Sequence, residues 1–201
     1  SLSPHIVLEE LGIAHETESV NLKTKVTASG ANFLAINPKG RVPALVTPQG
    51  TLTETPALLA YVAQTFPQAG LAPADPYGFA RMQEFHSYLA STVHVAHAHR
   101  PRASRWADEP EAQAAMQRKV PQNMTDCFQL IETHYLSEGP WVLGDQYSVA
   151  DGYLFTCCNW ASMLNISLAA YPNLGAFMGR IAERPSVQRA MQEEGLLNKA
   201  A

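Results

Sequence analysis

A proline at the head of a predicted strand marks the first cluster of residues that could hold a ligand. The cluster reads Gly40-Arg41-Val42-Pro43-Ala44-Leu45. Because proline has no N–H for a sheet, a strand that begins with it lies at an edge or bends away. If the Val42–Pro43 bond is cis, the bend exposes the N–H and C=O of Val42, and an extended peptide can pair with them as an added strand. An ordinary trans bond is the alternative, since only about one X-Pro bond in twenty is cis.

A second cluster, Thr53-Glu54-Thr55-Pro56, combines a carboxylate with a helix start. Thr55 suits the N-cap of a helix, and Pro56 suits its first position. The free N–H groups and the positive end of the helix dipole attract a carboxylate, while Glu54 can accept an ammonium group. The cluster therefore predicts a site for an amino-acid head group. A plain capped helix with a solvated Glu54 is the other interpretation.

The histidine and cysteine patterns do not predict a metal site. One predicted helix carries four histidines: His86, His94, His97 and His99. No carboxylate or cysteine stands beside them at ligand spacing, so we expect no metal. The three cysteines, Cys127, Cys157 and Cys158, cannot all pair with one another, which indicates buried thiols in a reduced, intracellular protein.

The composition excludes several classes of protein. The chain has 201 residues, of which 46% are hydrophobic and 16% are charged, and its formal net charge is −4. These values suit a globular protein and exclude collagen, a coiled-coil rod and a disordered acidic tail. No long run of Lys or Arg occurs, so we expect no nucleic-acid partner. The uncharged stretch 152–179 is interrupted by asparagines and Pro172, so we expect no membrane span, and the first residues resemble no signal peptide.

The elements that would position these clusters are predicted to be strands and helices in the first third of the chain and helices alone after it. Hydrophobic spacing and turn residues predict a helix over 3–11 capped by Ser3, strands over 16–22, 42–46 and 51–53, and a helix over 57–66. Further helices are predicted over 77–100, 111–136 with a kink at Pro121, 148–164, 173–183 and 186–194. Ser148 and Asp151 form a capping box. Because residues 67–76 hold three prolines, we expect an α/β domain over 1–66, a linker over 67–76 and an all-α domain over 77–201.

Four motifs in this order resemble a cytosolic glutathione transferase, most closely the bacterial beta class. They are Asn37-Pro38-Lys39-Gly40-Arg41-Val42-Pro43-Ala44-Leu45, Glu54-Thr55, Ser148-Val149-Ala150-Asp151 and Glu183-Arg184-Pro185-Ser186-Val187. The resemblance, which covers nearly the whole chain, implies a thioredoxin-like N-terminal domain, a helical C-terminal domain and a homodimer in the bacterial cytoplasm. It also implies that glutathione is the co-substrate. Its thiolate would be conjugated to a small hydrophobic electrophile in detoxification, with peroxide or disulfide reduction as a further activity.

The resemblance further implies the residues of a glutathione site: Lys25, Arg41, Val42, Pro43, Glu54, Thr55, Ser87 and Ser91. The main chain of Val42 would pair with the cysteinyl unit, and Pro43 would be the cis proline. Glu54 and Thr55 would hold the γ-glutamyl head group, and Lys25 would approach the glycyl carboxylate. Ser87 would reach glutathione across the dimer.

Catalysis by such a protein requires a lowered thiol pKa, because the thiolate attacks electrophiles. A free thiol has a pKa of about 8.5, and a helix N-terminus or a hydrogen-bond donor lowers it. The candidates are Ser1 as the hydroxyl donor and His94 beside the thiol, together with the helix that opens at Ser3-Pro4. Ser3 itself fits a helix cap better than a catalytic role.

Two departures from the family pattern leave a second function open. The family has a central strand before the position of Ser1, between the strands at 16–22 and 42–46. Its absence would leave backbone groups unpaired, so we expect about ten residues to precede Ser1 in the complete protein. The beta-class cysteine that bonds glutathione would also precede Ser1. Without it, and with Thr55 where the family usually has serine, the alternative is a non-catalytic ligand-binding or protein-interaction module of the same fold.

Overall fold

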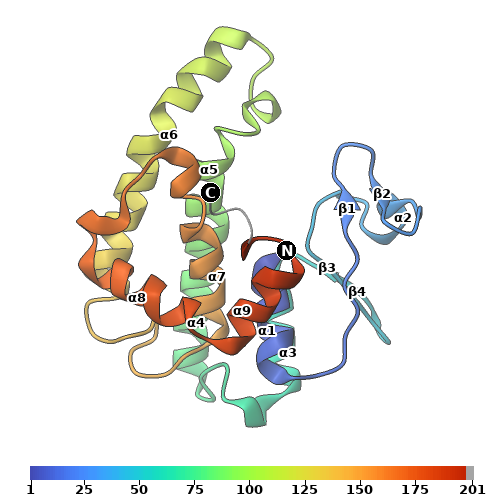
Figure 1. Cartoon of the computed structure of the whole chain (residues 1–201), viewed down its shortest axis with the longest axis vertical. Coiled ribbons are helices and arrows are strands. Elements are labelled where there is room, and N and C mark those ends of the chain that lie inside the picture. The colour runs from blue at the N-terminus through green and yellow to red at the C-terminus, as the bar shows by residue number, and fades with distance from the viewer. Residues whose placement is uncertain (198–201) are drawn as a thin grey trace.

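The computed structural model describes residues 1–197, with a small N-terminal α/β part beside a larger helical part (Figure 1). The N-terminal part contains α1 Leu2–Leu11, β1 Val20–Asn21, β2 Val26–Thr27, α2 Phe33–Ile36, β3 Ala44–Thr47, β4 Gly50–Thr53 and α3 Thr55–Thr65. The helical part contains α4 Pro76–Tyr88, α5 His94–Ala98, α6 Pro110–Leu130, α7 Val149–Cys158, α8 Pro172–Ala182 and α9 Pro185–Glu193. The end of the predicted helical domain, residues 198–201, lies outside the described residues.

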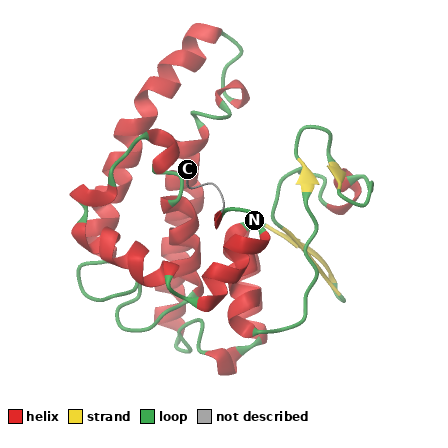
Figure 2. Cartoon of the chain, in the orientation of Figure 1, coloured by secondary structure: helices red, strands yellow, loops and turns green. Residues whose placement is uncertain are grey.

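The strands form two separate antiparallel pairs at one side of the molecule (Figure 2). β1 pairs with β2, and β3 pairs with β4 in a register that runs from Ala44–Thr53 to Thr47–Gly50. Within residues 1–197 no pairing joins β1 to β3, as expected for two strands that share no central partner. The predicted strand over 16–22 is too long, because only the two residues of β1 find a partner. β3 begins at residue 44 rather than 42, because Pro43 has no N–H to donate to a ladder.

α1 begins earlier than the sequence predicted. Its first residue is Leu2, and Ser1 stands at the N-cap without a side-chain cap bond. The prediction of Ser3 as the cap is therefore wrong. Its side chain is buried inside the first turn, and its Oγ has no hydrogen-bond partner among the described residues. Because Leu2 is buried one turn before the fully buried Ile6, the helix extends to include it.

Two helices that the sequence predicted as continuous are interrupted by π-helical turns. α4 passes into a π-helix at Leu89–Val93 before α5 begins, and α6 passes into another at Ile131–Tyr135. A π-turn accommodates an extra residue, which the spacing of apolar residues does not reveal. α6 continues through Pro121, and the kink expected there stays a prediction.

α7 is the centre of the hydrophobic core. It packs against α1, α3, α4 and α8. The apolar stripe predicted over 148–164 is buried, with Ala150, Leu154 and Cys157 in α7 and with Ala161 and Leu164 after its end. The predicted capping box is present, with Asp151 Oδ2 accepting from the Ser148 N–H at 2.7 Å and from its hydroxyl at 3.1 Å. α7 ends at Cys158, so the predicted helix over 148–164 is too long. No described helix has the length and apolarity needed to cross a membrane.

Candidate functional site

The bend before β3 presents an unpaired stretch of main chain. The Val42–Pro43 peptide bond is cis, as the ligand-binding interpretation requires. No hydrogen bond between described residues uses the main-chain N–H or C=O of Val42. An extended peptide can therefore pair with Val42 in the way the sequence predicted.

Asn37 shapes the loop that leads into this bend. Its side chain is 1% exposed, its Nδ2 donates to the C=O of Arg41 at 2.5 Å, and its Oδ1 accepts from the N–H of Lys39 at 3.1 Å. Gly40 completes the turn with a φ of 60°, in the left-handed region that glycine tolerates best. Asn37 is a structural residue of the site that the sequence did not predict, because nothing in its motif indicates that its side chain is buried.

Lys25 lies against the same loop. Its Nζ donates to the C=O of Gly40 at 2.7 Å, and its side chain is half-buried. An ammonium group has three N–H donors, so two remain for a ligand carboxylate. Arg41, in the loop itself, is exposed. These two cations give the site a positive side, as the predicted glycyl carboxylate requires.

Glu54 has an ammonium partner within the protein. Its Oε1 accepts from Lys39 Nζ at 2.6 Å, and the same Nζ donates to Thr53 Oγ1 at 2.7 Å. The sequence predicted a ligand ammonium at this carboxylate and did not predict Lys39. The two charged side chains are 49% and 62% exposed, so their pairing is weak, and a ligand ammonium can share or displace it.

The N-terminus of α3 is not blocked by a protein side chain. Thr55 was predicted as its N-cap, but Glu54 occupies that position, with a φ of 72° and no side-chain cap bond. Thr55 is instead the first helical residue, and its side chain lies near the phenol of Tyr153 of α7. The first helical N–H that finds a main-chain acceptor is that of Leu58, which donates to the Glu54 C=O at 3.1 Å. The open N–H groups before it suit a carboxylate.

Tyr153 is a second residue that the sequence did not predict. Its side chain is 3% exposed, and burial raises the pKa of its phenol well above the ordinary range. The hydroxyl is therefore protonated at neutral pH. The phenol lies near Thr55, and α7 packs against α3, so the central helix of the helical part lies beside the start of α3.

His94 brings the helical part to the same site. It opens α5 directly after the π-helix Leu89–Val93, and its ring centroid lies 5.0 Å from that of Trp160. Burial lowers the pKa of His94, and the charges of Arg102, Arg105 and Arg41 lower it further, while Glu54 raises it. The imidazole is thus neutral at pH 7, and it lies within electrostatic reach of two predicted ligand residues, Arg41 and Glu54.

Three predicted site residues make no described contact with the bend or with α3. Ser1 stands at the N-cap of α1, with a hydroxyl that makes no cap bond. Ser91 Oγ donates to the C=O of Ser87 at 2.8 Å, and both side chains are exposed. Ser91 also lines a groove of about 520 Å³ between the α4–α5 segment and α6. The roles of Ser1, Ser87 and Ser91 stay predictions.

The other histidines of the α4–α5 segment pack against aromatic rings. His97 stacks on Trp160 at 4.5 Å between centroids, and His99 stacks on Trp106 at 4.1 Å. The three cysteines are free and buried, as predicted, and burial raises the pKa of each thiol. They are therefore core residues.

The fold and the site together define a glutathione transferase, and comparison with known proteins shows that the chain belongs to the glutathione S-transferase family. The family model "Glutathione S-transferase, N-terminal domain" matches residues 1–64, and "Glutathione S-transferase, C-terminal domain" matches residues 97–194. The predicted fold class, a thioredoxin-like α/β domain followed by a helical domain, is confirmed.

Individual relatives confirm the resemblance to the bacterial beta class. Glutathione S-transferase GstA of Escherichia coli O157:H7 is 34% identical over 199 residues, which cover 98% of this chain and 94% of that protein. A glutathione transferase homolog from Sulfitobacter, solved with bound glutathione, is 42% identical, with a TM-score of 0.88 over 96% of this chain and 92% of the other. The bacterial beta class enzyme of Sphingomonas chungbukensis is 38% identical, with a TM-score of 0.85 over 97% and 94% of the two chains.

Proposed function

We propose that this protein joins the thiolate of glutathione to small hydrophobic electrophiles. The observation that carries the proposal is a pair of open binding edges at one end of the β3–β4 pair. Because Ala44 pairs with Thr53, the unpaired main chain before β3 and the uncapped start of α3 belong to the same end of the β3–β4 pair. The peptide backbone of glutathione can pair with Val42 while its γ-glutamyl head group reaches Glu54 and the α3 N–H groups.

The remaining predicted residues complete the proposed site. Lys25 and Arg41 attract the glycyl carboxylate, and Pro43 holds the bend. Ser87 and Ser91 approach glutathione, Ser87 from the partner protomer of a homodimer.

The thiolate is stabilised by the hydroxyl of Ser1 and by the positive end of the α1 dipole. The neutral imidazole of His94 lies beside the thiolate and donates a hydrogen bond there. Peroxide or disulfide reduction is a further activity that the same thiolate can support.

We also infer a cytoplasmic homodimer that acts in detoxification, as membership of the glutathione transferase family implies. Light scattering coupled to size-exclusion chromatography measures the mass of the particle in solution. Twice the chain mass is expected, and a single chain mass at catalytic concentrations contradicts the dimer.

Glutathione-dependent consumption of an aromatic halide by the full-length protein, measured beside calorimetric binding of glutathione, tests the proposed activity. We expect saturable turnover, and we expect Ser1→Ala to lower kcat. Ser104→Ala, which replaces an exposed serine outside the site, is the matched control and should leave kcat unchanged. Failure to bind millimolar glutathione would remove the proposal. Binding without turnover of several classes of electrophile would favour the non-catalytic module instead.

A further inference from the structure

A separate group of metal-ligating side chains lies where α1 meets α9. His5 and Glu9 stand one turn apart on α1, and His15 follows in the loop after the helix. One ligand atom from each of the three residues lies within 4.8 Å of the other two. Gly12 ends α1 in the left-handed conformation, and this turn lets the chain fold back so that His15 faces Glu9.

The ring of His15 is held in the tautomer that a metal requires. Its Nδ1 lies 2.9 Å from the C=O of Ile13, which can only accept a hydrogen bond, so Nδ1 carries the hydrogen. In the neutral ring the lone pair is then on Nε2, which lies 3.5 Å from Glu9 Oε1. A backbone carbonyl that fixes a histidine in this way is typical of metal sites.

His5 is buried between two carboxylates of the C-terminal segment. Its Nε2 lies 3.1 Å from Glu193 Oε2, and its Nδ1 lies 3.3 Å from Glu194 Oε1. A neutral imidazole has a single N–H, so one of the two carboxylates then faces a ring lone pair. Either a ring proton or a metal ion bound at that nitrogen removes the repulsion.

The charges around the three ligands also favour a divalent cation. Glu9 Oε2 is paired with Arg189 Nε of α9, which leaves Oε1 on the side of His15. The N-terminal ammonium of Ser1 pairs with Glu194 Oε1 at 2.9 Å. With this ammonium and the guanidinium of Arg189 counted, the carboxylates of Glu9, Glu193 and Glu194 leave one net negative charge. Two imidazoles with carboxylate oxygens suit zinc and its neighbours in the transition series better than magnesium or calcium.

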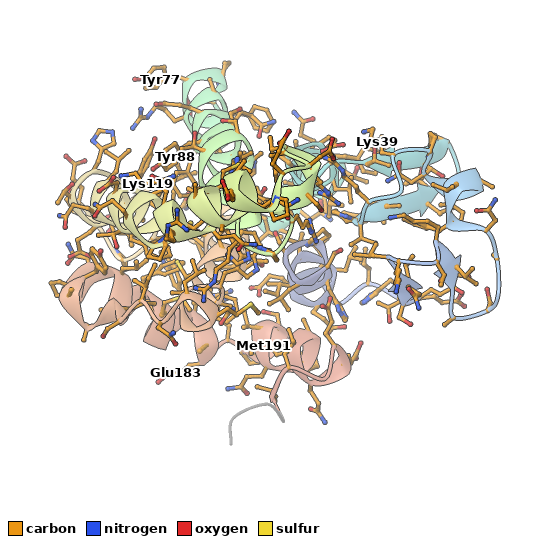
Figure 3. The ribbon with its side chains drawn as sticks, turned by 90° about the horizontal axis from the view of Figure 1, so that it is seen from above. Lys39, Tyr77, Tyr88, Lys119, Glu183 and Met191 are labelled. Atoms are coloured by element: carbon orange, nitrogen blue, oxygen red, sulfur yellow. The ribbon has the colours of Figure 1, made fainter. Side chains whose placement is uncertain are left out.

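We propose that His5, Glu9 and His15 form a binding site for a divalent transition metal of the zinc type. In a tetrahedral site with metal–nitrogen bonds of about 2.0–2.1 Å, the ligand atoms lie about 3.4 Å apart. The side chains therefore need to close by at most about 1.4 Å at the widest pair, which small rotations achieve. The bound metal joins α1 to the loop that follows it, on the side where α9 packs against α1 (Figure 3).

Zinc titration of untagged, chelator-treated full-length protein tests the proposal, with binding followed by calorimetry and Co²⁺ substitution followed by visible absorption. We expect one ion per chain, a raised unfolding temperature and the intense absorption of tetrahedral cobalt. His15→Gln and Glu9→Gln should each weaken zinc affinity by at least about 10–100-fold, the range that even outer-shell partners of a metal site contribute.

His134→Gln is the matched control, because His134 is an exposed histidine outside the group, and it should leave zinc affinity unchanged. Circular dichroism confirms that each variant is folded, and glutathione turnover should persist in His15→Gln. Lack of zinc binding by the wild-type protein would overturn the proposal. Equal zinc affinity in the wild type and in a folded His15→Gln would do the same.

Discussion

Among residues 1–197 the Glu54 carboxylate has one hydrogen-bond partner, the Lys39 ammonium, and a second is proposed in the ligand. Both partners are ammonium groups, so they compete for the same oxygens. The two side chains are largely exposed, so their pairing adds little to stability. Removal of Glu54 and removal of Lys39 should therefore have different effects on the affinity for glutathione, and neither should change the stability of the fold much.

Glu54→Ala is expected to weaken glutathione binding by about 1–3 kcal/mol, as the loss of a charged hydrogen-bond partner does. Lys39→Ala should leave the affinity equal or higher, because it removes the competitor. Calorimetric titration measures both, and Val42→Ala is the control, since its main-chain contacts remain. Unchanged affinity in Glu54→Ala would take Glu54 out of the site.

At this scale the sequence predicts those residues whose role depends on their neighbours in the chain. Glu54 and Thr55 are recognisable because a carboxylate, a hydroxyl and a proline stand together. Lys39 and Tyr153 were not predicted, because they reach the same place from a loop and a helix that the fold alone brings near. Glu54 rather than the predicted Thr55 is the N-cap residue of α3, and the cause is local, because Glu54 adopts a positive φ.

The turn at Gly40 connects the loop that Asn37 shapes to the bend before β3. A Cβ at this position would lie 3.1 Å from both Leu34 Cδ2 and Lys25 Cε, and the φ of 60° disfavours any other residue. The element is therefore adapted to glycine both in backbone conformation and in space.

Gly40→Ala is expected to lower the free energy of unfolding by about 1–2 kcal/mol, from left-handed strain and crowding against Lys25. Gly179→Ala is the matched control. Gly179 lies in α8 with nothing within 4 Å of an added Cβ, and alanine there should stabilise by up to about 1 kcal/mol. Urea unfolding measures both changes, and a Gly40→Ala protein as stable as the wild type would contradict the reading of this turn.

The packing of α4 on α7 places a histidine in the core. His86 is 0% exposed, its Nδ1 lies 2.8 Å from Gln83 Oε1, and its ring lies 6.0 Å from that of Tyr153. Burial lowers the pKa of His86 from 6.5 to about 4. The unfolded chain therefore binds a proton at a higher pH than the folded one, so stability is present above pH 6.5 and is lost as the pH falls to about 4.

His86→Leu is expected to reduce this acid-induced loss by about 3 kcal/mol, which corresponds to the lowered pKa. Urea unfolding at several pH values between 7 and 4 gives the slope for each protein, with His134→Gln as the control. Asp151, whose pKa burial raises to about 6, acts in the opposite direction, but its contribution is common to all three proteins. Parallel pH profiles for the wild type and His86→Leu would contradict the prediction.

The sequence predicts which helices and strands exist better than it predicts where each one is interrupted or ends. The capping box of Ser148 and Asp151 located the start of α7 correctly, because the motif satisfies its own backbone groups within a few residues. The π-turns were not predicted, because apolar residues fit a straight helix of 3.6 residues per turn equally well. The short β1 has a similar explanation, since strand length depends on a partner that the strand's own sequence does not specify.

The two parts of the molecule are joined by α1, which packs against α7 and α9 (Figure 1). Arg184, between α8 and α9, donates to Glu10 of α1, and its guanidinium carbon lies 3.7 Å from the centroid of the Tyr147 ring. Ser186 also donates to Glu10. The contact is thus a polar network between distant ends of the chain.

Arg184→Ala is expected to lower the free energy of unfolding by about 1.5–3 kcal/mol, the usual cost of a lost hydrogen bond to a charged group. Arg118→Ala, at an exposed position of α6, should change it by less than about 0.5 kcal/mol. Urea unfolding at pH 7 distinguishes the two, and equal effects would argue against the network.

The predicted boundaries of the domains, 1–66, 67–76 and 77–201, stay a prediction.

The extra residue of the π-helix Leu89–Val93 sets the direction in which the side chains of the following helix, α5, point. In a straight α-helix one residue corresponds to about 100° of rotation. Deleting a single residue within 89–93 would therefore swing the imidazole of His94 away from Arg41 and Glu54 without removing any of these groups. The position of His94 near Arg41 and Glu54 therefore depends on the rotational phase of the helix as much as on which residues are present.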